Sequence, residues 1–210
     1  SEDPISGGRH KVIGSKALNI PPQTSTIASH FPKAVGTAFS IDRAKDLDIP
    51  ERKIKSGSIV LCSFGDASVN HATALSAFNT ASLVTSQGGH MPIIFICEDN
   101  GTGISVPTDD RWIEKNFANR PEVVYIQTDG LHLIDLIIKS RSAEQDCRIN
   151  RRPIFLHMKT VRLMGHAGSD VEVGYRPLAE IVETEFNDPL LHSSRILMEN
   201  QCLSDDDILK

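Results

Sequence analysis

The sequence predicts an α/β fold in which a mostly parallel sheet carries helices on both faces. Short apolar runs alternate along the chain with longer segments of helical pattern, which is typical of parallel sheets. The apolar runs are continuous, so each strand is expected to be buried on both faces. At 210 residues, the chain is long enough for one domain with a full-sized core.

Four strands and three helices account for this prediction. The expected strands are residues 59–63, 93–97, 123–127 and 153–159, the expected helices are residues 29–44, 70–86 and 131–146, and more helices follow residue 177. Residues 1–27 have no clear period and contain several glycines and prolines, which predicts an irregular N-terminal segment. A domain over residues 28–200 is expected next. Residues 201–210 are interpreted as the start of a truncated helix with Ser204 at its N-cap.

The composition argues against two classes of partner. The net charge is −5 and the longest basic run is Arg151-Arg152, expected in a solvated turn, so no nucleic-acid partner is predicted. No apolar stretch approaches the ~20 residues that cross a bilayer, so no membrane partner is predicted either. The four cysteines form no C-x-x-C pair and two lie in expected core strands, which indicates reduced thiols and a cytoplasmic setting.

Polar residues at two strand ends are the candidate ligand-binding residues. Asp66 follows the first expected strand, and Asn100 follows the second. In parallel sheets ligands bind beyond the carboxyl ends of the strands, and adjacent strands would bring these two side chains together. A carboxylate, an amide oxygen and a nearby main-chain carbonyl are hard oxygen donors of the kind that magnesium takes, alongside phosphate oxygens.

Small residues around these positions favour a bound diphosphate. Gly65, Ala67 and Ser68 would open the helix after the first strand, where free amides hold phosphate. Gly101 and Gly103 would let the second turn approach a bound group closely. Alternatively, Asp66 merely caps a helix and the second segment is an ordinary turn, and either segment alone favours that interpretation.

Three segments in the same order resemble one family. "GDAS" (65–68) followed by "IIFICEDNGTGISVPT" (93–108) is similar to the thiamine-diphosphate signature. "TSTIASHFPKAVGTAFS" (24–40) resembles a cofactor-facing segment, and "KTVRLMGHAGSDVEVGYRP" (159–177) resembles an active-site loop. Together they look like the alpha subunit of the decarboxylating component of 2-oxoacid dehydrogenase complexes, most like the branched-chain (2-oxoisovalerate) type. The resemblance implies the thiamine-diphosphate-binding fold, with this chain supplying the diphosphate-binding domain.

The resemblance assigns roles to the strand-end residues. It implies that Mg²⁺ is held by Asp66, Asn100 and the main-chain oxygen of Thr102. The residues implied to lie along the diphosphate of thiamine diphosphate are Gly65, Ala67 and Ser68.

It also assigns roles outside the strand ends. Ser25 and Ile27, in the N-terminal segment, match positions that contact the aminopyrimidine, with Ile27 wedged under the cofactor. His166 matches the loop histidine that faces the diphosphate and the reacting carbon, and His10 the second active-site histidine. Arg162, also expected near the cofactor, and Asp170 match residues that order the loop.

Four positions depart from the family pattern. Ala67 replaces a glycine, which requires a negative φ at that residue. Asp99 stands where the first asparagine of a pair is usual and adds a charge near the metal. Thr102 replaces a tyrosine, and Ala167 replaces a regulatory serine, which excludes phosphorylation at that position.

The resemblance implies oxidative decarboxylation of a branched-chain 2-oxoacid and transfer of the acyl group to a lipoyl carrier. The partners it implies are a pyrimidine-domain (beta) subunit or a fused beta-like domain, and a lipoyl-bearing acyltransferase core. Assembly would be a heterotetramer or a homodimer of fused chains, and this chain would be a fragment that is inactive alone. The alternatives are a pyruvate or acetoin dehydrogenase alpha subunit, or a non-catalytic domain of the same fold. Generic dinucleotide binding is disfavoured because no G-x-G-x-x-G follows a strand.

Overall fold

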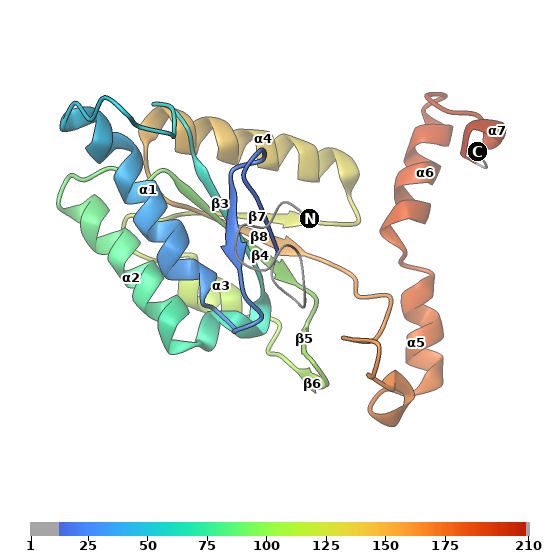
Figure 1. Ribbon diagram of the computed structural model, residues 1–210. Helices are drawn as coiled ribbons and strands as arrows, with labels where there is room; N and C mark the ends of the chain where they lie inside the picture. The colour runs from blue at the N-terminus through green and yellow to red at the C-terminus, as the bar shows by residue number, and fades with distance from the viewer. Residues whose placement is uncertain (1–12, 209–210) are drawn as a thin grey trace.

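A four-stranded parallel sheet forms the centre of the computed structural model, which describes residues 13–208 (Figure 1). Its strands are β3 (Val60–Gly65), β4 (Ile93–Asp99), β7 (Val124–Asp129) and β8 (Ile154–Lys159), in the spatial order β3-β4-β8-β7. Every neighbouring pair is parallel. The α/β prediction is therefore confirmed, and each strand lies within two residues of its expected position.

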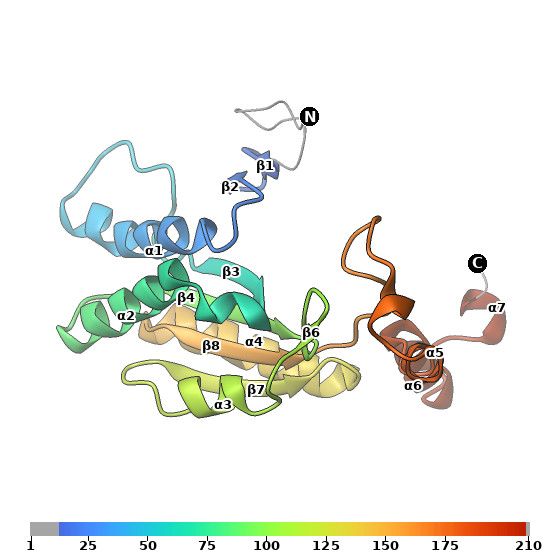
Figure 2. The same ribbon diagram turned by 90° about the horizontal axis from the view of Figure 1, so that it is seen from below.

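Helices cover both faces of this sheet, as predicted. One face packs against α1 (His30–Asp46), α2 (Ala72–Ser86) and α3 (Trp112–Phe117), and the other against α4 (Leu133–Asn150). Figure 2 shows α2 and α3 in front of the strands, α1 beside β3, and α4 behind the strands. Covering both faces buries the continuous apolar strands on each side, which explains why their residues do not alternate with polar ones.

Aromatic rings form the larger of the two cores. The ring of Phe78 in α2 meets Phe95 of β4 edge-on at 4.8 Å and Phe117 of α3 at 4.8 Å, and Phe117 stacks on Phe155 of β8 at 4.1 Å. These four side chains are at most 1% exposed. Because they come from two helices and two strands, they fix α2 and α3 relative to the sheet.

Several short elements were not predicted. β1 (Ile13–Ser15) and β2 (Ile20–Gln23) form an antiparallel hairpin within the segment expected to be irregular. Its two consecutive prolines obscured the strand, since proline is tolerated only at sheet edges. Thr102–Gly103 (β5) pairs with Val106–Pro107 (β6), and Asp66–Asn70 (η1) and Glu172–Gly174 (η2) are 3₁₀ turns.

The chain after β8 leaves the sheet. Residues 160–177 lead to α5 (Leu178–Glu185), α6 (Pro189–Glu199) and α7 (Asp205–Ile208), which lie apart from the sheet (Figure 1). Ser204 caps α7 as expected, because its Oγ accepts a hydrogen bond from the amide of Asp207 at 3.3 Å. Within residues 13–208, no helix combines the length and apolar character needed to span a bilayer.

The prediction of a solvated turn at Arg151-Arg152 is wrong for Arg151. Arg151 ends α4 in the left-handed conformation (φ +52°), and its guanidinium donates two hydrogen bonds to Asp42 of α1, at 2.7 and 2.9 Å. Both side chains are 12% exposed. A third bond reaches the carbonyl of Ser58 at 3.0 Å, so this ion pair joins the two faces at the amino edge of β3. Arg152, in contrast, is half-exposed and pairs with Asp146.

We predict that Asp42→Asn changes the pH dependence of stability. Burial opposes ionisation of Asp42, but the hydrogen bonds and charge of Arg151, with a smaller contribution from His90, outweigh it and lower the pKa of the carboxyl. The resulting stabilisation is present above the unfolded pKa of about 3.9 and is lost as pH falls through the lower folded value. At pH 7 the variant should lose about 2–3 kcal/mol of unfolding free energy, below the 3–5 kcal/mol of a fully buried pair.

Urea unfolding at stepped pH measures this effect. The two proteins should converge in stability as pH falls below about 4. Asp46→Asn, at an exposed site in the same helix, is the matched control and should track the unsubstituted protein. Parallel pH curves for the unsubstituted protein and Asp42→Asn would contradict the prediction.

Candidate active site

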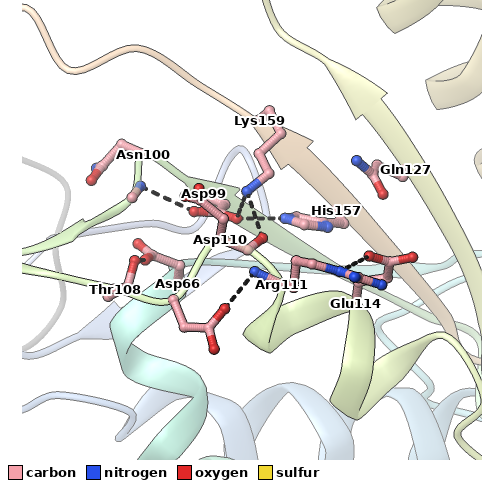
Figure 3. A network of polar contacts seen from close by, with 12 residues as sticks. Asp66, Asp99, Asn100, Thr108, Asp110, Arg111, Glu114, Gln127, His157 and Lys159 are labelled. Atoms are coloured by element: carbon pink, nitrogen blue, oxygen red, sulfur yellow. Dashed lines mark hydrogen bonds and ion pairs between the residues drawn. The ribbon is translucent and has the colours of Figure 1, made fainter.

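The carboxyl ends of β3 and β4 bring the two predicted ligand residues to one edge of the sheet. Gly65, the last residue of β3, lies opposite Glu98 of β4 in the parallel register. Asp66 follows directly and is buried, 3% exposed, and Asn100 follows the end of β4. Figure 3 shows both side chains at this edge.

A hydroxyl holds the Asp66 carboxylate. Its Oδ2 accepts a short hydrogen bond from Thr108, which lies just after β6. No other bond to this carboxylate occurs among residues 13–208, so Oδ1 keeps its acceptor capacity. A buried carboxylate with a free oxygen, at the end of a strand, is a suitable donor for a divalent cation.

The helix predicted to open at Gly65 begins later. Residues 66–70 form the 3₁₀ turn η1, and α2 starts at Ala72, with the amide of Thr73 capped by the ring of His71. Gly65, Ala67 and Ser68 therefore lie at a tight turn rather than in the first turn of an α-helix. The side chains of Asp66 and Asn70 accept hydrogen bonds from Thr108 and from the indole of Trp112, so contacts with the segment after β6 hold this turn.

The turn after β4 packs directly on η1. A Cβ placed on Gly103 would stand 2.9 Å from the Cβ of Ala67, closer than real side-chain atoms approach. Ala67 itself has no positive φ, so the condition set by its replacement of a glycine is met. Ala67 and Gly103 are thus in close contact between the two strand ends. Only Ala67, on the η1 side, contributes a Cβ to this contact.

Local hydrogen bonds fix the turn that carries Asn100 and Thr102. The amide of Thr102 donates to Asn100 Oδ1 at 3.0 Å, and the amide of Gly101 donates to Asp99 Oδ1 at 3.0 Å. Gly101 adopts φ +74°, which only glycine takes without strain. Its carbonyl accepts from the amide of Thr108 at 2.9 Å, so the turn is joined to the segment that holds Asp66.

A buried polar network below this turn was missed by the sequence reasoning. Asp99 Oδ2 accepts from His157 Nε2 at 2.7 Å and from Lys159 Nζ at 2.6 Å (Figure 3). The other ring nitrogen of His157 lies 2.6 Å from the hydroxyl of Tyr125. Neither Asp99 nor His157 is more than 3% exposed.

The partners of Asp99 explain why this buried carboxylate is charged, and the polar residues of β8 indicate that such partners exist. Burial alone would raise the pKa of Asp99, but hydrogen bonds from His157 and Lys159 outweigh it and the pKa falls to about 2. In the sequence, His157 and Lys159 end an otherwise apolar strand, which is costly for polar groups unless they find partners. That cost is the signal in the sequence that these two residues have buried partners.

The predicted active-site loop is folded by its own polar side chains. Asp170 Oδ2 accepts from the amide of His166 at 2.6 Å and from the hydroxyl of Tyr175 at 2.7 Å. Arg162 donates to Tyr175 at 2.9 Å and to the carbonyl of Ile104 at 2.7 Å. The bond to Ile104 ties the loop to the β5–β6 hairpin. The imidazole of His166 is exposed, and its role stays a prediction.

The predicted cofactor contacts of the N-terminal segment, Ser25 and Ile27, lie in the turn between β2 and α1. His30, at the start of α1, bonds through Nε2 to the carbonyl of Ser63 in β3 at 3.0 Å. Ala28 is buried in a left-handed conformation (φ +61°), and the preceding Ile27 is 58% exposed. An alanine rarely adopts this conformation, so the backbone of this turn is strained. Ser25 is exposed in the same turn, and His10 lies outside the described residues.

The donor set suits magnesium only together with a phosphate ligand. Among residues 13–208, no group of three or more His, Cys, Asp or Glu side chains is placed to hold a metal. Asp66, Asn100 and the Thr102 carbonyl are one carboxylate and two neutral oxygens, so phosphate and water would have to complete an octahedron. The residues present therefore fit a metal that arrives with a diphosphate, but not a metal held by protein alone.

Comparison with known proteins decides the family. The family model described as "Dehydrogenase E1 component" matches residues 1–209. The chain belongs to this family.

Curated relatives agree with the assignment at low identity. The chain is 28% identical over 212 residues to the 2-oxoisovalerate dehydrogenase subunit alpha of Bacillus subtilis, covering 97% of this chain and 59% of the relative. It is 27% identical over 203 residues to the mouse mitochondrial counterpart (95% and 42%). To the mitochondrial pyruvate dehydrogenase E1 component subunit alpha of Dictyostelium discoideum it is 27% identical over 184 residues (87% and 45%). The chain thus spans about half the length of these relatives.

We predict that Gly103→Ala destabilises the protein through its contact with Ala67. The added Cβ has no room, and overpacking of this kind costs about 1–3 kcal/mol. Ala67→Gly in the same protein removes the opposing Cβ, so the double variant should recover most of the loss. Urea unfolding measures each step, and the coupling is read from the double-mutant cycle.

Gly36→Ala is the matched control. Gly36 lies in α1 with no atom near its missing Cβ, so this change should stabilise the helix by about 0.5–1 kcal/mol. Additive effects of Gly103→Ala and Ala67→Gly would contradict the contact.

Proposed function

We propose that this chain is the diphosphate- and magnesium-binding part of a thiamine-diphosphate-dependent 2-oxoacid dehydrogenase. Proteins of the Dehydrogenase E1 component family use thiamine diphosphate. The observation that supports the proposal most directly is the convergence of Asp66 and Asn100 at the ends of two adjacent parallel strands. Neither side chain would be explained by core packing, since both are polar and one is a buried carboxylate.

The proposed metal ligands are Asp66, Asn100 and the carbonyl oxygen of Thr102. Asn100 Oδ1 already accepts one bond from the Thr102 amide, which aims the amide group and leaves its second lone pair for a cation. The close contact between Ala67 and Gly103 brings the two backbone segments near enough to line one diphosphate. Gly65, Ala67 and Ser68 are the proposed lining residues on the η1 side.

The remaining proposed site residues come from two loops. Ile27 offers an exposed apolar side chain in the turn before α1, suited to pack under a ring, and Ser25 lies in the same turn. His166, whose ring is exposed in its loop, is the proposed acid–base residue, together with His10. Arg162 is the proposed support that holds the His166 loop against the β5–β6 hairpin.

The proposed reaction is oxidative decarboxylation of a branched-chain 2-oxoacid with acyl transfer to a lipoyl carrier. Bound thiamine diphosphate supplies the electron sink for this chemistry. The chain's own residues bind and orient it, neutralise charge and move a proton. The 2-oxoisovalerate dehydrogenase relatives favour the branched-chain substrate, and the pyruvate dehydrogenase relative keeps pyruvate as the second candidate.

Alpha subunits of this family pair with beta subunits in 2-oxoacid dehydrogenase complexes. We propose a beta subunit, or a fused beta-like domain, as the partner here, and a lipoyl-bearing acyltransferase core as the acceptor. The isolated 210 residues would then show no turnover. The cytoplasmic setting predicted from the free cysteines stays a prediction, and two of the relatives named above are mitochondrial.

We predict that Asp66→Asn abolishes tight binding of thiamine diphosphate with Mg²⁺. The change keeps the shape and the Thr108 contact but removes the charge that a divalent cation needs. Loss of a residue outside the ligand shell typically costs 10–100-fold in metal affinity, so loss of this ligand should cost roughly 100-fold or more. The measurement is calorimetric titration of thiamine diphosphate in excess Mg²⁺, on the complete protein with its partner polypeptide.

Asp129→Asn is the matched control. Asp129 also ends a parallel strand, but this strand is β7, which lies at the opposite edge of the sheet from β3. The Asp129→Asn substitution should therefore leave binding unchanged. Unchanged affinity in Asp66→Asn would contradict the proposed metal site. Absence of binding by the unsubstituted complete protein would favour a non-catalytic domain of the same fold.

A further inference from the structure

Asp99 stands next to a proposed metal ligand, yet the protein itself uses both of its oxygens. Oδ2 accepts from His157 and Lys159, and Oδ1 accepts from the amide of Gly101. With three donors on its two oxygens, the Asp99 carboxylate has most of its acceptor capacity used within the protein. Asp66, whose Oδ1 accepts no bond among residues 13–208, is the better suited of the two carboxylates to bind a cation.

The register explains how this cluster forms. Asp99 of β4 lies opposite Lys159 of β8. Two residues earlier on each strand, Cys97 lies opposite His157. Gln127 of β7 continues the same row beyond His157, and Tyr125 reaches the ring of His157 from that strand. Side chains at alternate positions share a face, so these residues gather at the carboxyl end of the sheet on the side covered by α1, α2 and α3.

Lys159 also reaches the second half of the site. Its Nζ donates to the carbonyl of Asp110 at 3.2 Å as well as to Asp99. Asp110 is two residues beyond Thr108, whose hydroxyl holds the Asp66 carboxylate. One ammonium group thus joins the turn that carries Asn100 to the segment that orients Asp66.

We propose that Asp99, His157 and Lys159 are positioning residues that preorganise the proposed metal- and diphosphate-binding turn without touching the ligand. This inference rests on the proposed function. The Asp99 carboxylate holds the Gly101 amide, and with it the left-handed turn that presents Asn100 and Thr102. His157 orients the carboxylate, and Lys159 neutralises it. A buried carboxylate without such donors would be too costly to keep charged.

Preorganisation has a specific consequence for binding. A turn held in its binding geometry before the ligand arrives loses less conformational freedom on binding, so affinity is higher for the same contacts. Loosening the turn should therefore weaken binding of thiamine diphosphate with Mg²⁺ more than it slows turnover at saturating cofactor. If these residues only stabilised the fold, their loss would lower the melting temperature without weakening cofactor binding more than turnover.

The experiment compares four variants in the complete protein with its partner polypeptide. Asp99→Ala removes all three accepted bonds and should weaken thiamine diphosphate binding about 10-fold or more, as expected for residues that support metal ligands. Asp99→Asn retains an acceptor for Gly101 and should lose less. Lys159→Met keeps the alkyl stem but loses the ammonium and should fall between these two, and Lys159→Arg should restore most of the affinity.

Cofactor affinity is read by calorimetry in excess Mg²⁺, and kcat and the KM for thiamine diphosphate by steady-state assay. Lys139→Met is the matched control, because Lys139 forms an exposed ion pair with Asp135 on α4. If Asp99→Ala does not fold, Lys159→Met carries the test, since the Lys159 side chain is 35% exposed.

Unchanged affinity in Asp99→Ala and Lys159→Met would overturn the positioning role while leaving the proposed function intact. Loss of binding in Asp99→Asn with no effect of Lys159→Met would also overturn it, because that pattern indicates direct coordination by Asp99. Failure of the unsubstituted protein to bind would overturn the proposed function first, and this role with it.

Discussion

The parallel pairing of β3 with β4 is the constraint on which the rest of the site depends. Because both strands run in the same direction and lie in register, Gly65 opposite Glu98, their carboxyl ends finish at the same level. An antiparallel pair would place Asp66 and Asn100 at opposite edges. In the aromatic core beneath, the ring of Phe78 lies 5.9 Å from Phe64 of β3 and 4.8 Å from Phe95 of β4, so one helix side chain packs on both strands.

Three further connections join the strand ends into one unit. Thr108 holds the Asp66 carboxylate by its hydroxyl and the Gly101 carbonyl by its amide. Arg162 ties the His166 loop to the β5–β6 hairpin through the carbonyl of Ile104. The site is thus built from segments separated by about a hundred residues of chain and carried by short turns, which suits residues that must be placed accurately on a rigid scaffold.

The sequence was sufficient for the sheet and for the ligand types at its edge. Continuous apolar runs such as residues 93–97 predict buried parallel strands, and a polar residue directly after such a run stands out, as Asp66 does. It was insufficient where long-range pairing decides the structure. Arg151 looked like a solvated residue because its partner, Asp42, lies more than a hundred positions earlier. The partners of His157 could not be predicted either, because they depend on the register of β8 against β4. The 3₁₀ turn before α2 likewise has long-range partners, since Asp66 and Asn70 bond to Thr108 and Trp112, each 42 positions later.

The most direct test of the account is a crystal structure of the complete protein with its partner, thiamine diphosphate and Mn²⁺ in place of Mg²⁺, using anomalous scattering to locate the metal. The account predicts one metal peak at the ends of β3 and β4. Asp66, Asn100 and the Thr102 carbonyl should all lie at ligand distance, about 2.0–2.1 Å for magnesium and slightly longer for manganese, with diphosphate oxygens on the open side. A metal and diphosphate elsewhere on the molecule, or a metal at this edge without Asp66 and Asn100 as ligands, would contradict it.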